Sequence, residues 1–500
     1  MSSTAVYALV LVLYMAALLG AGVWTGRRTR SAEDFYIGGR QVGPWVTAFS
    51  FVAAYFSSVV IVGGGAFGYR FGMSTMWVAA SNVLIGCTLA WIVLGKRLWE
   101  FSKRLDTMTI PGFIGRRYGA REAEVFSAVV IFLFMIVYNV SVLQGMGRIL
   151  EGLMGLPYVH GILISGAIIL VYVAFGGYLA VVWTSFIQAW IMLFALSLLA
   201  VAALAAAGGF QAAGERLAAM DPGLVATPGV WGWQGLVSYC LIVSLGVWGM
   251  PQLLVRFYSM RSARVLRLGT VLATLGGAMA VLPYMTGAVA RVILPPLENP
   301  DLAIPTLTKT VLNPWGGAVF LAGVLAAGMS TFASVLIIVS AAIVKDLRRS
   351  GEAGRSRAGG GAGSMVARTS EDGGSTRGPS RDVLLGRAAS LGAGLVSLVV
   401  ALRPPALILV VTAFSWAVIA SACLWPVVLG VTWRRGTRQG ALASMVAGTA
   451  TALGWMIAKM PLGIHGFIPG VAMSLIVFVV VSLATKPPAR ELVDAAWGRS

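Results

Sequence analysis

The chain has few of the side chains that usually carry out chemistry in enzymes. Only 11% of its 500 residues are charged, two are histidines and three are cysteines. The cysteines, at positions 87, 240 and 423, do not have a metal-binding spacing. No Gly-x-x-x-x-Gly-Lys-Ser/Thr loop is present, so ATP does not drive a process here. No catalytic constellation is visible, and we therefore predict that the protein is not an enzyme.

Long apolar runs dominate the chain instead, and 58% of its residues are hydrophobic. Runs of about 20 apolar residues, each long enough to cross ~30 Å of hydrocarbon, recur from end to end. Continuous runs exclude a β-barrel, whose strands alternate in hydrophobicity. We predict an all-α polytopic membrane protein with about thirteen transmembrane helices, a multi-pass protein of the inner (plasma) membrane. The expected spans lie near 5–25, 45–66, 75–95, 124–150, 158–177, 180–206, 233–255, 267–293, 315–344, 386–402, 406–431, 440–458 and 465–484.

Basic residues are concentrated in every second loop. Arg27, Arg28 and Arg30 follow the first span, and Arg256 and Arg261 begin the basic segment after the seventh. The alternate loops hold one basic residue or none. The positive-inside rule therefore puts the N-terminus outside and the C-terminus in the cytoplasm. The net charge of +19 then faces anionic lipid, so we expect membrane lipid and not nucleic acid as a partner.

Two of the predicted spans contain residues that interrupt a helix. The second, VTAFSFVAAYFSSVVIVGGGAFGYRFG, holds a serine pair at 57–58 and three glycines at 63–65. The seventh, SLGVWGMPQLLVRF, contains Pro251, which removes a backbone donor. Freed carbonyls survive at membrane depth only where they line protein or a cavity. Alternatively, such small residues serve helix packing, and hydroxyls bond back to their own helix.

The two interrupted spans are five positions apart and begin two blocks of five spans. A block with an odd number of spans inverts the topology of its copy. We therefore expect a peripheral first helix (1–30), a first inverted repeat (31–206) and a second inverted repeat (207–431). Residues 432–500 add two helices and a cytoplasmic tail. Within the second repeat, the Gly-, Ser- and Arg-rich segment 350–381 predicts a disordered cytoplasmic loop.

Four motifs resemble those of the sodium:solute symporter family, which includes pantothenate and proline permeases and sodium/sugar cotransporters. They are DFYIGGR (34–40), FGGYLAVVWTSFIQ (175–188), GMPQLLVRF (249–257) and AAGMSTFAS (326–334). The resemblance covers about residues 30–485. It implies a LeuT-type 5+5 inverted repeat and Na⁺-coupled symport of a small solute by alternating access.

The resemblance also implies a cation site. Carried over by motif, its ligands are the carbonyls of Ala53, Phe56 and Ala327 and the hydroxyls of Ser330 and Thr331. Helical geometry agrees, because a residue three or four positions before the hydroxyl pair lies one turn below it on the same face. Five neutral oxygens suit Na⁺ without burying a negative charge. No acidic residue lies deep in a span, whereas a proton-driven carrier usually needs one there.

The sequence departs from the family at the cation pathway. Position 185 is serine where the family usually has an aspartate, and Ala333 beside Ser334 leaves a secondary sodium site incomplete. Sodium then binds through neutral ligands only, or coupling is lost and the protein is an uncoupled facilitator. We favour retained Na⁺ coupling because all five primary positions are plausible, and we place proton coupling third.

The solute is expected near the midplane, between the two interrupted spans. No fixed charge lies among the polar and aromatic candidates there, and packing is the alternative role for each aromatic residue. Span 2 resembles the pantothenate and monocarboxylate branch of the family, which favours a small organic acid or an amino acid. The candidates are Tyr55, Ser57, Ser58, Tyr138, Asn139, Gln144, Trp248, Gln252 and Trp416.

Overall fold

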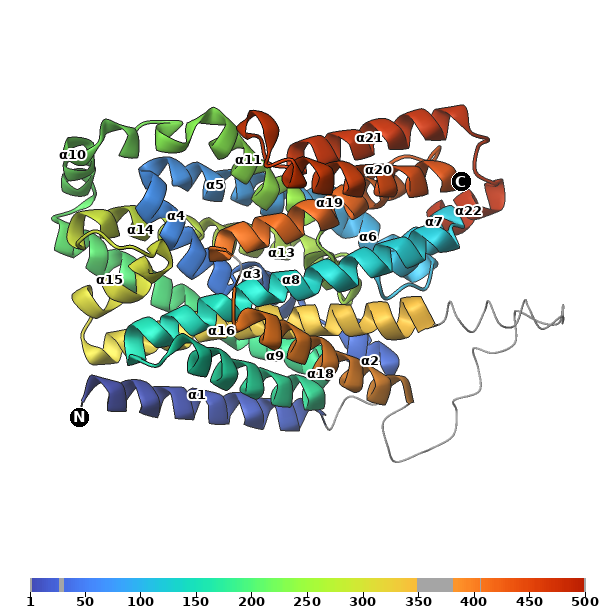
Figure 1. The fold of residues 1–500 in the computed structure, drawn as a ribbon. Helices are drawn as coiled ribbons and strands as arrows, with labels where there is room; N and C mark the ends of the chain where they lie inside the picture. The colour runs from blue at the N-terminus through green and yellow to red at the C-terminus, as the bar shows by residue number, and fades with distance from the viewer. Residues whose placement is uncertain (1, 27–30, 349–380, 405, 499–500) are drawn as a thin grey trace.

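The computed structural model describes residues 2–26, 31–348, 381–404 and 406–498 (Figure 1). These residues form helices, and the only strand-like pairing among them is an isolated bridge between Val42 and Met260. Ten of their helical stretches are long and apolar enough to cross a membrane, and two shorter ones are apolar. The predicted all-α membrane architecture is confirmed, whereas the count of thirteen and the orientation stay predictions. The predicted loop 350–381 lies outside the described residues except for Arg381.

The α-helices are α1 (Ser3–Gly26), α2 (Ala32–Ile37), α3 (Pro44–Tyr55), α4 (Gly64–Phe71), α5 (Met76–Ser81), α6 (Lys96–Arg104), α7 (Ile110–Tyr118), α8 (Arg121–Met154), α9 (Tyr158–Ala207), α10 (Phe210–Met220), α11 (Gly232–Ser244), α12 (Pro251–Tyr258), α13 (Val265–Ala278), α14 (Val281–Ile293), α15 (Ala303–Val311), α16 (Pro314–Ala341), α18 (Arg381–Ala401), α19 (Ile408–Thr432), α20 (Arg438–Ile457), α21 (Phe467–Ala484) and α22 (Arg490–Trp497). Short π-helical segments are η2 (Val59–Gly63), η4 (Asn82–Leu89), η5 (Trp91–Gly95) and η10 (Ala342–Leu347). Short 3₁₀ segments include η8 (Leu245–Gly249) and η9 (Pro300–Leu302).

Both predicted interruptions are present. In span 2, α3 ends at Tyr55, Phe56 is extended (φ −77°, ψ 90°), and the helix resumes at Val59. In span 7, α11 and η8 end at Gly249, Met250 is extended (φ −87°, ψ 110°), and Pro251 begins α12. Proline suits this first helical position because its missing N–H would have no intrahelical partner there. A third break, in α9 at Gly177 (φ 60°), separates the predicted fifth and sixth spans.

Helix α16 forms the centre of the molecule. Every residue from Phe320 to Ala341 is buried, because α16 packs against α1, α3, α8, α9 and α18 (Figure 1). An apolar sequence on all faces is what a fully enclosed helix requires. Helices α20 and α21 pack side by side at one edge of the bundle, and α1 lies at the opposite edge (Figure 1). The division into repeats at 31–206 and 207–431 stays a prediction.

The second half of the interrupted helix lies directly against the backbone of α14. A Cβ added at Gly68 would stand 2.0 Å from the Tyr284 carbonyl oxygen, and one at Gly287 would stand 2.0 Å from the Gly65 carbonyl oxygen. Two helices approach this closely only where small residues remove the side chains between them. The glycines of α4 and α14 therefore fix where the second half of the broken helix lies.

We expect Gly287→Ala to destabilise the protein by about 1–3 kcal/mol, the usual cost of forcing an extra carbon into a packed interior. The measurement is the thermal unfolding temperature of the purified protein in detergent. Gly454→Ala in α20 is the matched control, since a Cβ there meets no atom within 4 Å. Equal unfolding temperatures for the two variants would contradict the close packing of α4 on α14.

Candidate cation and solute site

The hydroxyl pair of α16 lies opposite the point where α3 ends. The Ser330 hydroxyl donates hydrogen bonds to the carbonyl oxygens of Ala53 and Ala327, both at 2.9 Å. The Thr331 hydroxyl donates to Ala54 at 3.2 Å and to Ala327 at 3.1 Å. All of these residues are buried. The structure therefore brings four of the five predicted cation-site residues into direct contact, across 277 positions of sequence.

The break of α3 explains why its carbonyls are available. The last carbonyls of a helix have no intrahelical donor, and the Ser57 N–H, which would reach Ala53 in a continuous helix, bonds to Tyr55 instead. The resemblance did not include the Ala54 carbonyl, although the same end effect frees it. Phe56 is fully buried at the cap of α3, and its carbonyl as a ligand stays a prediction.

The chemistry of these groups fits a small hard monovalent cation. They are neutral oxygens, and no group of three or more His, Cys, Asp or Glu residues in the described parts of the chain could hold a metal. Hydroxyls that bridge carbonyls can rotate their protons outward and present lone pairs to an ion. Carbonyls of an interrupted helix and hydroxyls of a facing helix are a donor set that binds Na⁺ in transporters.

The two predicted pathway residues lie on neighbouring helices. The Ser334 hydroxyl donates to the Ser330 carbonyl oxygen at 2.7 Å and accepts a hydrogen bond from Arg256 Nη2 at 2.6 Å. Ser185 on α9 is fully buried, and its hydroxyl has no partner within the described structure. Their role in the pathway stays a prediction.

Arg256 was expected in a basic loop, and the structure corrects this. It lies within α12 and is fully buried. The helix that restarts at Pro251 after the break continues to Tyr258, past residue 255, the expected end of span 7. The signal that could have shown this is Pro251, since a proline that starts a helix leaves the residues after it in the helix.

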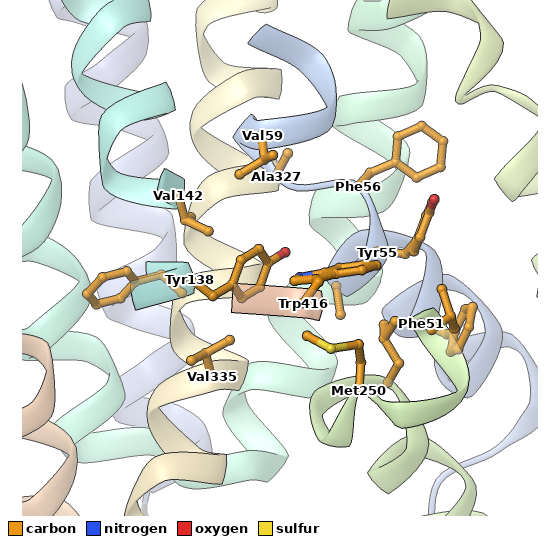
Figure 2. Packing of buried hydrophobic residues seen from close by; sticks show 14 of the residues in the cluster. Phe51, Tyr55, Phe56, Val59, Tyr138, Val142, Met250, Ala327, Val335 and Trp416 are labelled. Carbon is orange, nitrogen blue, oxygen red and sulfur yellow. The ribbon is translucent and has the colours of Figure 1, made fainter. Parts of the chain in front are cut away.

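A small cavity of about 20 Å³ lies on the other side of the α3 break. Four predicted solute residues line it: Tyr55, Ser57, Tyr138 and Trp416. Figure 2 shows three of them, Tyr55, Tyr138 and Trp416. The Tyr138 and Trp416 rings meet edge to face with centroids 5.8 Å apart. The indole N–H of Trp416 is buried without a partner in the described residues. This volume holds about one water molecule, so the helices must move apart before a solute enters.

The other predicted solute residues do not line this cavity, and their role in solute binding stays a prediction. Ser58 donates to the Val142 carbonyl at 2.7 Å, Trp248 to Ile85 at 2.9 Å, and Gln144 to Ala406 at 3.0 Å. The amide groups of Asn139 and Gln252 are buried without partners in the described structure.

Sequence reasoning missed part of the cavity wall. It includes Tyr239 from α11, Tyr284 from α14 and Thr412 from α19. The glycines at 63–65 were the available signal for Tyr284, because its ring lies 3.2 Å from where a Gly64 Cβ would be.

Asp301 joins the segment between α14 and α15 to the start of α19, beside this cavity. Its side chain is 1% exposed, and Oδ2 accepts a hydrogen bond from the Ile408 N–H at 3.4 Å. Burial raises the pKa of this carboxyl from 3.8 to about 6, although the Ile408 N–H and the Arg148 charge oppose the shift. Since Leu409 lines the cavity, the contact holds part of the cavity wall in place.

The comparisons with known proteins agree with the geometry. The model of the sodium:solute symporter family matches residues 35–353 and 380–448. The chain belongs to the sodium:solute symporter family. Such symporters are multi-pass proteins of the inner (plasma) membrane that couple Na⁺ to the transport of a small solute. Family membership makes the chain a transporter and makes Na⁺ its coupling ion.

Relatives of this symporter match over nearly the whole chain. It is 30% identical over 491 residues to the osmoregulated proline transporter OpuE of Bacillus subtilis, covering 96% of this chain and 94% of that one. It is 29% identical over 483 residues to the sodium/pantothenate symporter of Escherichia coli, covering 94% and 95%. These relatives extend the family assignment along the full chain.

Solved structures show the same fold. A Na⁺-coupled sialic acid symporter superposes with a TM-score of 0.78 at 17% identity, covering 97% of this chain and 99% of that one. MhsT in complex with L-phenylalanine superposes with a TM-score of 0.54 at 16% identity, covering 87% and 97%. The symporter therefore shares the LeuT-type fold that the resemblance implied.

The raised pKa of Asp301 predicts a pH dependence of stability. Between about pH 4 and 6 the folded state binds more protons than the unfolded state, so the free energy of unfolding falls as the pH rises through this range. Asp301→Asn has no carboxyl to ionise, and we expect it to lose less stability than the native chain between pH 5 and pH 7.5. Thermal unfolding at the two pH values measures this.

Glu298→Gln is the control for this prediction, because Glu298 is an exposed carboxylate in the same loop. It should keep the pH dependence of the native chain. The prediction fails if Asp301→Asn and the native chain lose equal stability across this range.

Proposed function

We propose that this symporter binds Na⁺ between the end of α3 and the hydroxyl pair of α16, and a small carboxylate-bearing solute in the neighbouring cavity. The observation that carries the proposal is the contact of Ser330 and Thr331 with the carbonyls freed where α3 breaks. The Na⁺ ligands are then the oxygens of Ala53, Phe56, Ala327, Ser330 and Thr331, with Ala54 added. The chain crosses the membrane about thirteen times, with its N-terminus outside and its C-terminus in the cytoplasm.

One segment serves both ligands, and this gives a physical basis for coupling. Ala53 and Ala54 face the hydroxyl pair, while the next residues, Tyr55 and Ser57, line the cavity. An ion that holds the carbonyls in place also fixes the backbone that carries the cavity wall. The free energy of Na⁺ binding therefore favours the conformation that binds the solute.

The cavity wall indicates the class of solute. No charged side chain lines it, and its polar groups are hydroxyls and the free indole N–H of Trp416. These donors suit one carboxylate, and the surrounding aliphatic and aromatic side chains suit a small apolar body. Proline and pantothenate, which the relatives' names specify, are both carboxylates of this kind. We therefore favour an amino acid or a small organic acid.

Proton coupling and uncoupled transport are the alternatives. In the described chain, the buried acidic residues are Asp301 and Asp346. Asp301 lies in the loop before α15, and Asp346 is twelve residues beyond Ser334, about 18 Å along the helix. Asp301 borders the cavity but does not line it, and Asp346 does not line it either, so neither carboxyl contacts the space assigned to the solute. Uptake of the solute responds to a Na⁺ gradient in symport but not in uncoupled transport, so measuring uptake with and without the gradient decides between them.

The test is uptake of radiolabelled proline, pantothenate and lactate into proteoliposomes with and without an inward Na⁺ gradient. For a transported solute, we expect the double variant Ser330→Ala, Thr331→Ala to raise the half-saturating Na⁺ concentration at least about tenfold, since each lost ligand to a cation is worth over 1 kcal/mol. Ser444→Ala is the control, because the buried Ser444 bonds only within α20. Solute uptake that ignores Na⁺ in the native protein would establish a facilitator.

Trp416→Phe tests the solute cavity separately. It keeps a ring but removes the indole N–H, so we expect the KM for the solute to rise about tenfold with the half-saturating Na⁺ concentration little changed. Trp425→Phe is the matched control, since its indole N–H bonds to the Val471 carbonyl oxygen at 2.9 Å and it does not line the cavity. Equal KM values for the two variants would remove Trp416 from the solute site.

A further inference from the structure

Arg256 is a buried cation without a counter-charge. Its side chain is fully buried, and it forms no ion pair with any described residue. Nη2 donates to the Ser334 hydroxyl at 2.6 Å, and the guanidinium carbon lies 5.2 Å from the centre of the Tyr178 ring. Nε and Nη1 have no acceptor within the described structure. A buried charge in this condition is costly unless an anion and further hydrogen bonds accompany it.

Ser185 lies on the same side of α9 as the residues that contact this region. It is one turn before Ala189, which packs against Ala53, and two turns after Tyr178, whose ring faces Arg256. Residues at these spacings share one face of a helix. Ser185 is also the position where the family usually has an aspartate. The hydroxyl present instead is buried, uncharged and without a partner in the described residues.

The neighbouring hydroxyls are already used. Ser334 donates to the Ser330 carbonyl, and Ser259 donates to the Arg256 carbonyl at 2.8 Å. The free donors on Arg256 and Ser185 are Nε, Nη1 and the Ser185 hydroxyl, and the amide of Gln252, one turn before Arg256 on α12, is also without a partner in the described residues. Of the three donors on Arg256 and Ser185, two belong to the positively charged guanidinium, and the third is the Ser185 hydroxyl. Hydrogen-bond donors with a positive charge attract a small anion and repel a cation.

We propose that Arg256 and Ser185 bind a small inorganic monovalent anion, of which chloride is the physiological example, together with Na⁺. The anion takes the place of the side-chain carboxylate that position 185 lacks. It neutralises Arg256, which lies one hydrogen-bonded residue, Ser334, away from the Na⁺ ligand Ser330. Because Na⁺ adds a second positive charge nearby, the anion strengthens Na⁺ binding, and by linkage Na⁺ strengthens anion binding equally.

The carboxylate of the solute does not fill this role. The solute cavity is lined from α3, η2, α8, α11, α14 and α19, whereas Arg256, Ser185 and Ser334 belong to α12, α9 and α16. Full burial of Arg256 and Ser185 also favours a monatomic anion over a larger one.

The experiment is thermal unfolding of the purified full chain in choline chloride and in choline gluconate at equal ionic strength, each titrated with the Na⁺ salt of the same anion. We expect chloride alone to raise the unfolding temperature relative to gluconate. We also expect the half-saturating Na⁺ concentration to be about fivefold or more lower in chloride, the lower end of common coupling strengths. Identical curves in the two anions would overturn the proposal.

Two variants of one residue separate a site from a general salt effect. Ser185→Asp supplies a fixed carboxylate, so the chloride effect should disappear while the response to Na⁺ remains. Ser185→Asn has the size of Asp without its charge and also removes the Ser185 hydroxyl, so it should lose the chloride effect and keep the weaker Na⁺ binding of the native chain in gluconate. A chloride effect that survives in Ser185→Asp would also overturn the proposal. If chloride acts but Na⁺ has no effect in either salt, the proposed cation site fails and the anion site stands.

Discussion

Two hydroxyls on α16 donate hydrogen bonds to carbonyls that α3 leaves free where it breaks. A helix end inside a membrane has to find partners, because no water is present to satisfy its carbonyls. Ser330 and Thr331 supply them from a helix that is enclosed on every side. This contact positions the start of the cavity wall at Tyr55 and Ser57, and it places neutral oxygens where a cation can bind. In the proposed mechanism, ion and solute therefore depend on the same backbone.

The proposed cation site has a positive side chain near it and no negative one among its ligands. The cation site itself contains no carboxylate, and the nearest buried charge to it on the α12 side is the positive Arg256. Neutral oxygens lower the cost of keeping the site dehydrated between ions, since no buried negative charge has to be tolerated. Because position 185 also holds a serine and no carboxylate, Arg256 has no negative partner there. A co-bound anion, as proposed, would restore the balance of charge.

Sequence patterns predicted most of the helical architecture and the residues at the centre of the proposed cation site. Hydropathy located the spans, and the serines, glycines and Pro251 located the interruptions, because these residues act on the backbone locally. Motif resemblance then identified Ala53, Ala327, Ser330 and Thr331, which the structure brings together. Arg256 was assigned to a loop because charge usually marks a membrane boundary, and only the continuation of α12 past the break places it inside. Tyr239 and Tyr284 were missed because nothing in their own segments indicates which cavity they face.

The sequence by itself determined the solvent, the helices and the points where helices break, because hydrophobicity and backbone preference act over a few residues. It also determined that any cation site must be made from neutral oxygens, since acidic residues are absent from the apolar runs. The tertiary structure decided which freed carbonyls meet which hydroxyls, including Ala54, and which side chains close the solute cavity. It alone showed that Arg256 is buried without a counter-charge among the residues that the structure describes. These features arise from packing between segments that are far apart in the sequence, and the local sequence of one segment does not show which other segment it contacts.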